Sequence, residues 1–314
     1  TAAVAELTPI TSCADQAALT SAVPPPSDPE ARARVDAARV RLADLTAMHR
    51  LGHYQDGLPL ARTLVADSRA IAHAPLIAAA LLLLAGFEAN AGDPATTTTL
   101  LLDAVAEAAR AGDRELHAEA WIALTRHTAI TMRRPDDATH WATAMSAAID
   151  LAHASPDRRA AGLSARGDAL ELRGDYAGAR AAYEQALALW VADGADPLRR
   201  SAAMDRLGAT LNHLGLPDQA RAMYSESLAA IERSLGPLHP RVASSLTNLA
   251  NLARDAGDYT TAWTLTQRAL TVREAANGPD HPGVARLHFN LAFLAQLRGD
   301  PAAARAGAER ALAI

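Results

Sequence analysis

The sequence contains one serine whose surroundings could support nucleophilic chemistry. Ser164 lies in the segment Gly162-Leu-Ser164-Ala-Arg-Gly167, which has part of the Gly-x-Ser-x-Gly pattern that exposes a catalytic serine on a sharp strand-to-helix turn. The second glycine comes one residue too late, and the segment lies in the middle of a predicted helix. We therefore predict that Ser164 is a helical residue and that the chain contains no catalytic residue.

Two pairs of histidines have spacings that could suggest a metal site. His49 and His53 are four residues apart, but Gly52 falls between them at a predicted turn, so they need not share a helix face. His239 and His281 each lie in a Gly-Pro-x-His-Pro segment, 42 residues apart, which is too far for one ion. We predict surface histidines in the first pair, His-Pro helix starts in the second, and no metal site.

Composition excludes several classes of function. The 30 basic residues are all arginines, and they face 35 acidic residues to give a formal net charge of -5. Nucleic acids and anionic membranes need a clustered positive surface, which this balance does not favour. Without lysine, the chain cannot supply a phosphate-loop, Schiff-base or kinase ATP-anchoring lysine. We expect no cofactor, no nucleic-acid partner and no enzymatic activity in this fragment.

The longest apolar run and the chain ends bear on the cellular context. The run over residues 76–87 is shorter than the roughly 20 residues that span a bilayer, so we predict a buried helix and no membrane insertion. The single cysteine, Cys13, cannot form an intrachain disulfide. The chain starts at Thr1 without a methionine and stops at Ile314 inside a helical pattern, so we expect a fragment of a longer protein.

The elements that position these residues come from an internal repeat. Glycines recur 40 to 42 residues apart, with one gap of 82 residues around Arg133, at Gly52, Gly92, Gly174, Gly215, Gly257 and Gly299. Apolar residues spaced three and four apart on both sides of each glycine predict two helices joined by a turn. We therefore expect an N-terminal segment with a Pro-rich linker over 1–29 and a helical array over 30–314, with approximate units 30–74, 75–115, 116–155, 156–196, 197–238, 239–280 and 281–314.

The repeat resembles a known family. A turn glycine, a small residue inside the first helix (Gly167, Gly208, Ala250, Ala292) and an Ala-Leu signature in the second helix are similar to the tetratricopeptide repeat (TPR), and the last linkers resemble the 42-residue repeats of kinesin light chains. The resemblance implies an all-α fold, a right-handed α-solenoid of about seven repeats. It also implies that the first helix of each pair lines a concave, peptide-binding wall.

The N-terminal segment carries a second resemblance. Cys13-Ala-Asp is followed by the linker PPPSDP over residues 24–29 and then by the repeats, in a chain rich in Ala and Arg and free of Lys. This arrangement resembles the region that follows the catalytic domain in myxobacterial serine/threonine protein kinases. It implies a bacterial protein attached to a membrane-anchored kinase. The side of the membrane stays open.

Candidate binding residues follow from the first helices of the last three units. Counted from the turn glycines, they are Asp205, Arg206, Asn212, Ser244, Asn248, Asn251, Arg254, Arg286, Phe289, Asn290 and Phe293. Asn248 and Asn290 are of most interest, because an amide both donates and accepts hydrogen bonds and can hold a peptide backbone. A structural role for both, in which they cap helices or bridge between neighbouring helices, is an equal alternative. Phe289 and Phe293 fit either a ligand anchor or a seam for a following helix.

These observations predict a scaffold that binds an unidentified protein or peptide, as the sensory or docking region of a bacterial serine/threonine kinase. Two alternatives stay open. The array could be structural and self-associate through its terminal repeats, or it could be the repeat region of a signal-transduction ATPase regulator or a protease effector.

Overall fold

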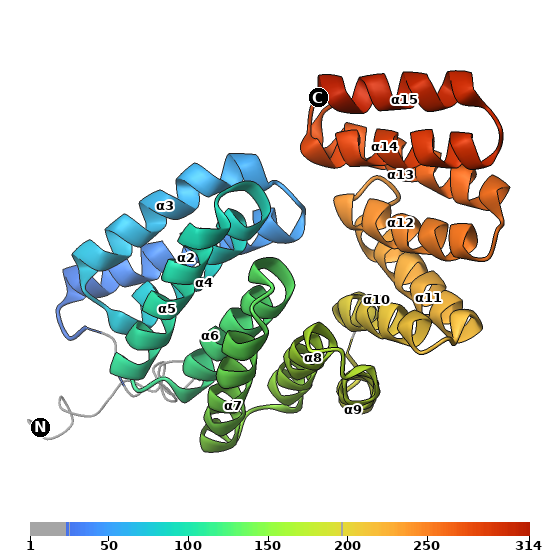
Figure 1. Ribbon diagram of the computed structural model, residues 1–314. Helices are drawn as coiled ribbons and strands as arrows, with labels where there is room; N and C mark the ends of the chain where they lie inside the picture. Colours follow the sequence, from blue (N-terminus) through green and yellow to red (C-terminus); the bar gives the residue numbers. More distant parts are fainter. Residues whose placement is uncertain (1–22, 25, 196) are drawn as a thin grey trace, which may run out of the picture. The chain divides into compact units, whose positions relative to one another are not determined.

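The chain is all-α, as the sequence predicts. The computed structural model describes residues 23–24, 26–195 and 197–314, and these residues form fourteen α-helices, α2 to α15, and no strand. The helices are labelled in Figure 1. Within each of the two compact parts described below, helices that follow one another pack as hairpins, which is the arrangement of an α-solenoid. Most of the predicted N-terminal segment, including Cys13, lies outside the described residues.

The described residues up to Arg158 form one compact unit, called unit 1 here. Its helices pair in chain order, and their bounds are α2 (Pro29–Arg50) with α3 (Tyr54–Ile71), α4 (Ala74–Ala91) with α5 (Pro94–Arg110), and α6 (Arg114–His127) with α7 (Pro135–Ala152). A π-helical turn over Thr128–Met132 extends α6.

The residues from Arg159 onward form a second compact unit, called unit 2. The boundary lies in the first turn of α8, so nearly all of this helix belongs to unit 2. Its helices are α8 (Pro156–Leu172) and α9 (Tyr176–Ala192), α10 (Pro197–His213) and α11 (Pro217–Leu235), α12 (Pro240–Asp255) and α13 (Tyr259–Asn277), and α14 (Pro282–Leu297) and α15 (Pro301–Ala313). The first helices also meet, since α10 contacts α12 as well as α11.

Left-handed residues close most of the turns between paired helices. The predicted glycines Gly52, Gly174, Gly215, Gly257 and Gly299 all have positive φ, between 74° and 84°. Gly92 is the exception, since its φ is -125°, and an added Cβ there would lie 1.7 Å from the Glu88 carboxylate, which would have to shift. In the repeat over residues 116–155, which lacks the turn glycine, Arg133 takes the left-handed conformation after the π-helical turn.

The His-Pro segments begin helices, which confirms that prediction. Helices α12 and α14 start at Pro240 and Pro282, directly after the N-cap residues His239 and His281. Each N-cap Nδ1 accepts a hydrogen bond from a backbone N–H two residues on, at 3.2 Å in α12 and 2.9 Å in α14. These two histidines therefore have a structural role in the described chain.

The core is aliphatic and rich in small residues. The apolar run over residues 76–87 lies within α4, where Leu81 and Phe87 are fully buried in the core of unit 1, as predicted. In unit 2, Leu246, Val242 and Ile231 form an equivalent core between α11 and α12. None of the helices in the described part of the chain has the length and apolar character needed to span a bilayer.

One sequence prediction about the histidines is wrong. His49 is not an ordinary surface residue, because its ring packs edge-on against Phe87 at 5.0 Å and against Tyr54 at 5.2 Å. Burial lowers the pKa of His49 below its usual value, which favours the neutral ring. His53 is exposed, so the two histidines do not act together.

Candidate peptide-binding surface

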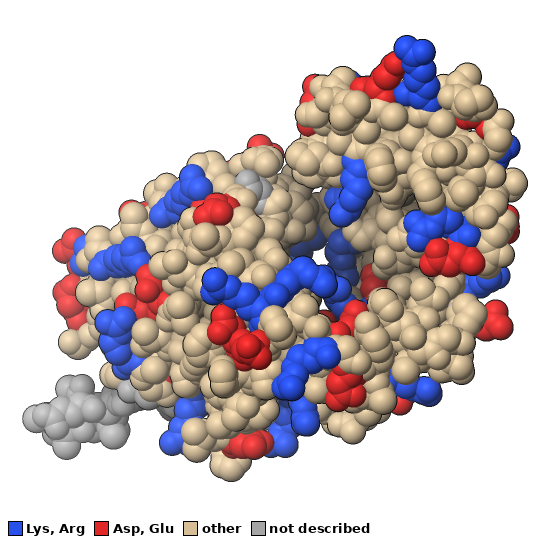
Figure 2. Space-filling view, viewed as in Figure 1, with Lys and Arg blue, Asp and Glu red and all other residues tan. Residues whose placement is uncertain are grey.

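The predicted binding residues lie on three first helices of unit 2. We call the solvent-facing side of α10, α12 and α14 that carries them the inner-helix surface. Ser244, Arg286, Phe289 and Phe293 are exposed on it, whereas the other seven candidates, Asp205, Arg206, Asn212, Asn248, Asn251, Arg254 and Asn290, are partly buried. Over the face of the molecule in Figure 2, charged side chains of both signs are scattered among wide uncharged areas.

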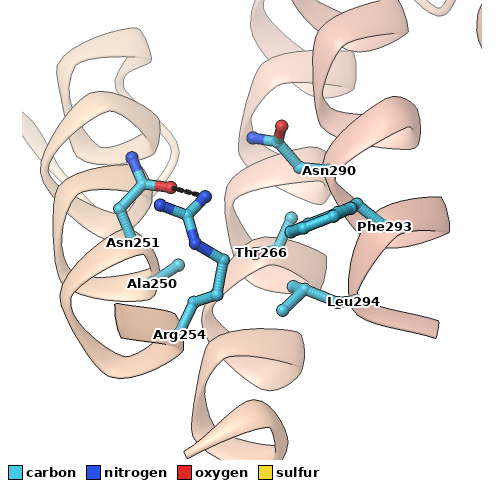
Figure 3. A pocket seen from close by; sticks show the side chains of 7 residues that line it. All are labelled: Ala250, Asn251, Arg254, Thr266, Asn290, Phe293 and Leu294. Carbon is cyan, nitrogen blue, oxygen red and sulfur yellow. Dashed lines mark hydrogen bonds between the residues drawn. The ribbon is translucent and has the colours of Figure 1, made fainter. Parts of the chain in front are cut away.

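Four of the candidates line one small pocket between α12 and α14. Asn251 and Arg254 come from α12, and Asn290 and Phe293 from α14, as Figure 3 shows. The rest of the lining is Ala250, Thr266 and Leu294. The pocket has room for about one water molecule. The sequence therefore predicted residues that the fold brings together from helices one repeat apart.

Arg254 is held firmly at the edge of this pocket. Its Nη1 donates to Asn251 Oδ1 at 3.2 Å, and its Nε and Nη2 donate to Asp255 Oδ1 at 3.0 and 2.8 Å. Figure 3 shows its guanidinium group between Asn251 and the α14 side chains. Two anchoring partners fix the direction of the remaining N–H groups, which favours recognition of an acceptor.

The exposed phenylalanines extend the surface along α14. Phe289 is 61% exposed and Phe293 is 44% exposed, one helical turn apart on the same face. The chain has only three phenylalanines, and the third, Phe87, is fully buried. Exposed aromatic side chains that adjoin hydrogen-bonding groups are typical of protein-binding surfaces.

A buried polar cluster, which the sequence reasoning missed, lies at the α8 end of unit 2. The Tyr183 hydroxyl donates to Asp168 Oδ1 at 2.8 Å and lies 3.2 Å from Glu171 Oε2. Thr210 donates to the same Glu171 oxygen at 3.1 Å, so the cluster joins α8, α9 and α10. Burial and the two nearby carboxylates raise the pKa of Tyr183 far above its usual value, so it stays a neutral donor.

The candidates Asp205 and Arg206 are engaged next to this cluster. Arg206 Nε lies 3.6 Å from Asp168 Oδ1, and the Ser245 hydroxyl donates to the two Asp205 oxygens at 3.4 and 3.3 Å. Burial raises the pKa of Asp205 to about 6, and hydrogen bonds from Ser227 and Ser245 with the charges of Arg241 and Arg206 offset part of that rise. Both side chains thus connect neighbouring first helices.

The structure also bears on the predictions about Ser164 and about metal sites. Ser164 lies inside α8, buried, as predicted. Among the described residues, no group of three or more His, Cys, Asp or Glu side chains is arranged to hold a metal ion. The inner-helix surface carries amide, hydroxyl, carboxylate and guanidinium groups and two aromatic rings, which are groups that make hydrogen bonds, ion pairs and apolar contacts.

The comparison with family models identifies the repeats in this part of the chain. A tetratricopeptide repeat model matches residues 199–275 and again residues 241–314. Residues 199–314 are thus similar to tetratricopeptide repeats. All eleven candidates lie in this matched segment, on α10, α12 and α14. None of the curated protein sequences matches the chain significantly.

Solved structures with the same fold are similar over larger parts of the chain. A Rap protein complexed with Competence and Sporulation Factor is 12% identical with a TM-score of 0.64, and the match covers 88% of this chain and 76% of that one. A putative kinesin light chain with nearly identical TPR-like repeats, from Podosopora anserina, is 19% identical with a TM-score of 0.52, covering 62% of this chain and 93% of that one. These likenesses support the fold, and a TPR scaffold is suited to protein–protein interaction.

Proposed function

We propose that unit 2 binds an extended segment of a partner protein on the inner-helix surface between α12 and α14. The observation that carries the proposal is the convergence of Asn251, Arg254, Asn290 and Phe293 on one pocket beside the exposed Phe289. Amides that can donate and accept match the repeating N–H and C=O groups of a peptide, and an aromatic pair supplies an apolar anchor.

The polar side chains of the inner-helix surface support a binding role over a purely structural one. A surface whose only task is to pack against another helix would favour apolar side chains, since buried polar groups need partners. Here amides and a guanidinium group on α12 and α14 lie together with exposed aromatic rings of α14. The Rap protein complexed with Competence and Sporulation Factor is one case in which a structure of this fold holds another molecule.

The test is a double substitution of Asn248 on α12 and Asn290 on α14, two partly buried amides of the inner-helix surface. Peptides are first selected with the native chain from a display library of random twelve-residue sequences, and their affinities are measured by fluorescence anisotropy. Asn248→Ala with Asn290→Ala is expected to weaken binding about tenfold, since each amide contributes one or two hydrogen bonds of roughly 1 kcal/mol net. Helicity and melting temperature should stay nearly unchanged, because both side chains are only partly buried.

A matched control uses an asparagine away from this surface. Asn90 in unit 1 is exposed and bonds the Gly86 carbonyl, so Asn90→Ala should leave peptide affinity at the native value. Equal losses of stability and affinity in the double variant would place Asn248 and Asn290 in a structural role instead. Failure of the native chain to select any peptide would remove the proposed function.

We propose further that the scaffold is the sensory or docking region of a bacterial serine/threonine protein kinase. The support for this step is the resemblance of the segment Cys13-Ala-Asp, the linker over residues 24–29 and the lysine-free repeats that follow. The coding sequence upstream of Thr1 tests it directly. A kinase domain there would support the proposal, and a nucleotide-binding ATPase module or a protease domain would replace it.

A further inference from the structure

Helix α6 carries a histidine near each of its ends, and one of them bonds a tryptophan of the same helix. His117 lies near the start of α6, and His127 is its last residue. His117 Nε2 accepts a hydrogen bond from Trp121 Nε1 at 3.1 Å. Because an indole N–H only donates, this bond requires that His117 Nε2 carries no proton. The contact therefore exists only with a neutral His117 ring.

Trp121 connects His117 to α7, which packs against α6 (Figure 1). The ring centroids of Trp121 and Trp141, which belongs to α7, are 5.5 Å apart, with 37° between the ring planes. Both rings are partly buried and pack against a buried cluster that includes Leu124. An indole N–H that loses its acceptor finds a new one in water, so loss of the His117 bond favours a Trp121 ring that turns out of this interface.

His127 joins the other end of α6 to α5. Its ring is 7% exposed, and its Nε2 lies 3.1 Å from the Pro94 carbonyl oxygen and 3.0 Å from Thr98 Oγ1, both in α5. A carbonyl oxygen only accepts, so Nε2 carries the hydrogen and the neutral ring has an unprotonated Nδ1. Protonation of Nδ1 would place a positive charge in this buried contact, which costs free energy.

The backbone that follows His127 is irregular. A π-helical turn over Thr128–Met132 extends the helix, and Arg133 then has a φ of 51°, in the left-handed region that glycine adopts most readily. The Thr125 hydroxyl is buried and has no hydrogen-bond partner within the described residues. Each of these features costs stability. This end of α6 is therefore held less firmly than the helix ends that close with a glycine.

Within the described residues, no charged neighbour shifts the pKa of either ring. Burial lowers the pKa of His117 and of His127 below the ordinary 6.5, and the bond to Pro94 offsets part of this for His127. The carboxylates of α6 and of the helices packed against it pair with arginines or are exposed. The pairs are Glu115 and Glu119 with Arg158, Glu88 with Arg62, Asp103 with Arg69, Glu107 with Arg110 and Asp137 with Arg134, and the exposed carboxylates are Asp136 and Asp150.

We propose that α6 is an acid-responsive element of the fold, in which protonation of His117 and His127 releases the helix from α5 and α7 and exposes the Trp121–Trp141 pair. This inference goes beyond the proposed function, because it concerns unit 1 and requires no ligand.

The direction of the response follows from the lowered pKa values. The folded chain binds these two protons less tightly than the unfolded chain does. The stability that the neutral rings contribute is therefore present above about pH 6.5 and is lost progressively as the pH falls through 6.5 to the lowered values of the folded chain. Burial raises the pKa of Asp205 in unit 2, which gives the opposite dependence there.

The experiment follows the unfolding of unit 1 through its own tryptophans. Trp190→Phe with Trp263→Phe removes the two tryptophans of unit 2 and leaves Trp121 and Trp141 as reporters in the full chain. We call this variant the reporter chain. Its urea unfolding is followed by tryptophan emission at about pH 7.5 and at about pH 5, on either side of the ordinary histidine pKa.

The test variant is His117→Gln with His127→Gln in the reporter chain. A glutamine amide reaches the position of Nε2, where it can accept from Trp121 or donate to Pro94, but it takes up no proton in this pH range. The matched control is His140→Gln, which makes the same exchange at an exposed position of α7.

We expect the urea midpoint of the reporter chain to be lower at the acidic pH. In the test variant this fall should shrink to about half or less, with the remainder coming from His49 and His73, whose pKa values burial also lowers. The His140→Gln control should keep the full fall. The proposal is overturned if the reporter chain shows no fall, or if the test variant shows a fall of the same size.

A second variant decides the question if the glutamine variant does not fold. Trp121→Phe keeps an aromatic ring beside Trp141 and removes the indole N–H, so His117 can take up a proton without losing a bond. The fall in midpoint, reported by Trp141 alone, should again be smaller than in the reporter chain, and an unchanged fall would overturn the proposal.

Acrylamide quenching without urea tests the exposure of the Trp121–Trp141 pair directly. The reporter chain should be quenched more strongly at the acidic pH, and the test variant should change less. Equal quenching of the reporter chain at both pH values would overturn the release of α6.

Discussion

The α8–α10 end and the α12–α14 end of unit 2 use the same repeat positions for opposite purposes. At the first, Tyr183 fills the space between the paired helices and closes a polar cluster with Asp168 and Glu171. At the second, Thr266 leaves that space open beside Arg254 and Asn290. The comparison teaches that one repeat scaffold can be closed for stability or opened for binding by changing the residue pair that packs between its helices.

The first prediction has the largest expected effect and compares how much Tyr183 and Thr266 contribute to the free energy of unfolding. Tyr183→Ala is expected to lower the free energy of unfolding by about 3–5 kcal/mol, because it removes a fully buried aromatic ring and the hydroxyl that donates to Asp168 and Glu171. Thr266→Ala, at the equivalent position, should cost only about 1 kcal/mol. Urea unfolding followed by circular dichroism measures both, and equal losses would mean that the two ends are not built differently.

The second prediction concerns the α8–α10 end of unit 2, where the pKa of Asp205 is raised and stability should depend on pH. The group has a pKa of about 6 in the folded chain against an ordinary 3.8, so the folded state binds the proton more tightly than the unfolded state does. Its contribution to stability is therefore most favourable below about pH 4 and is lost as the pH rises through about 6. The change amounts to about 2–3 kcal/mol, at roughly 1.4 kcal/mol for each unit of pKa.

Asp205→Asn provides the comparison for this pH dependence. The stability of the variant relative to the native chain should increase between pH 4 and pH 7, because the amide has no charge to bury. Thermal unfolding across this pH range measures it. If the difference in stability between the native chain and the variant does not change with pH, burial does not raise the pKa of the Asp205 carboxyl group.

The third prediction concerns the α12–α14 end of unit 2, where substitutions should weaken peptide binding and leave stability nearly unchanged. Phe289→Ala with Phe293→Ala should weaken binding of selected peptides roughly thirtyfold, since exposed aromatic anchors carry much of the energy of an interface. Unfolding free energy should change by less than about 1 kcal/mol, because both rings are exposed. Leu151→Ala, which changes an exposed apolar residue in unit 1, is the control and should leave affinity unaltered.

Much of the fold could be predicted from the sequence because the repeat restates the same local rules. Turn glycines such as Gly174 and Gly257 and the helix starts at Pro240 and Pro282 depend on neighbours within a few residues, so a single sequence reveals them. The π-helical turn before Arg133 was not predictable in this way, because no glycine marks it and its geometry depends on the packing of α6 against α7.

The candidate site was predictable only in part. The repeat register placed Asn251, Arg254, Asn290 and Phe293 on corresponding faces, and the fold brings them to one pocket. The register could not show that a tyrosine in the second helix reaches across to two acids in the first. A signal was nonetheless present, since Gly167 with Tyr183 and Gly208 with Tyr224 occur as pairs, and Ala250 with Thr266 breaks the pattern.

His49 shows the same limit in unit 1. Its neighbours Phe87 and Gly86 come from α4, in the next repeat, so the sequence around His49 itself indicated only a turn. Contacts between repeats need the spacing of the helices, and that spacing depends on side-chain volumes at positions that local patterns do not connect.

The most direct test of the central claim is amide hydrogen exchange of the native chain with and without a selected peptide. The account predicts slower exchange confined to α12 and α14, with the largest change in the turns of helix that contain Asn251, Arg254, Asn290 and Phe293. Protection that falls instead on α8 and α10, or on the helices of unit 1, would contradict the assignment of the open end of unit 2 as the binding surface.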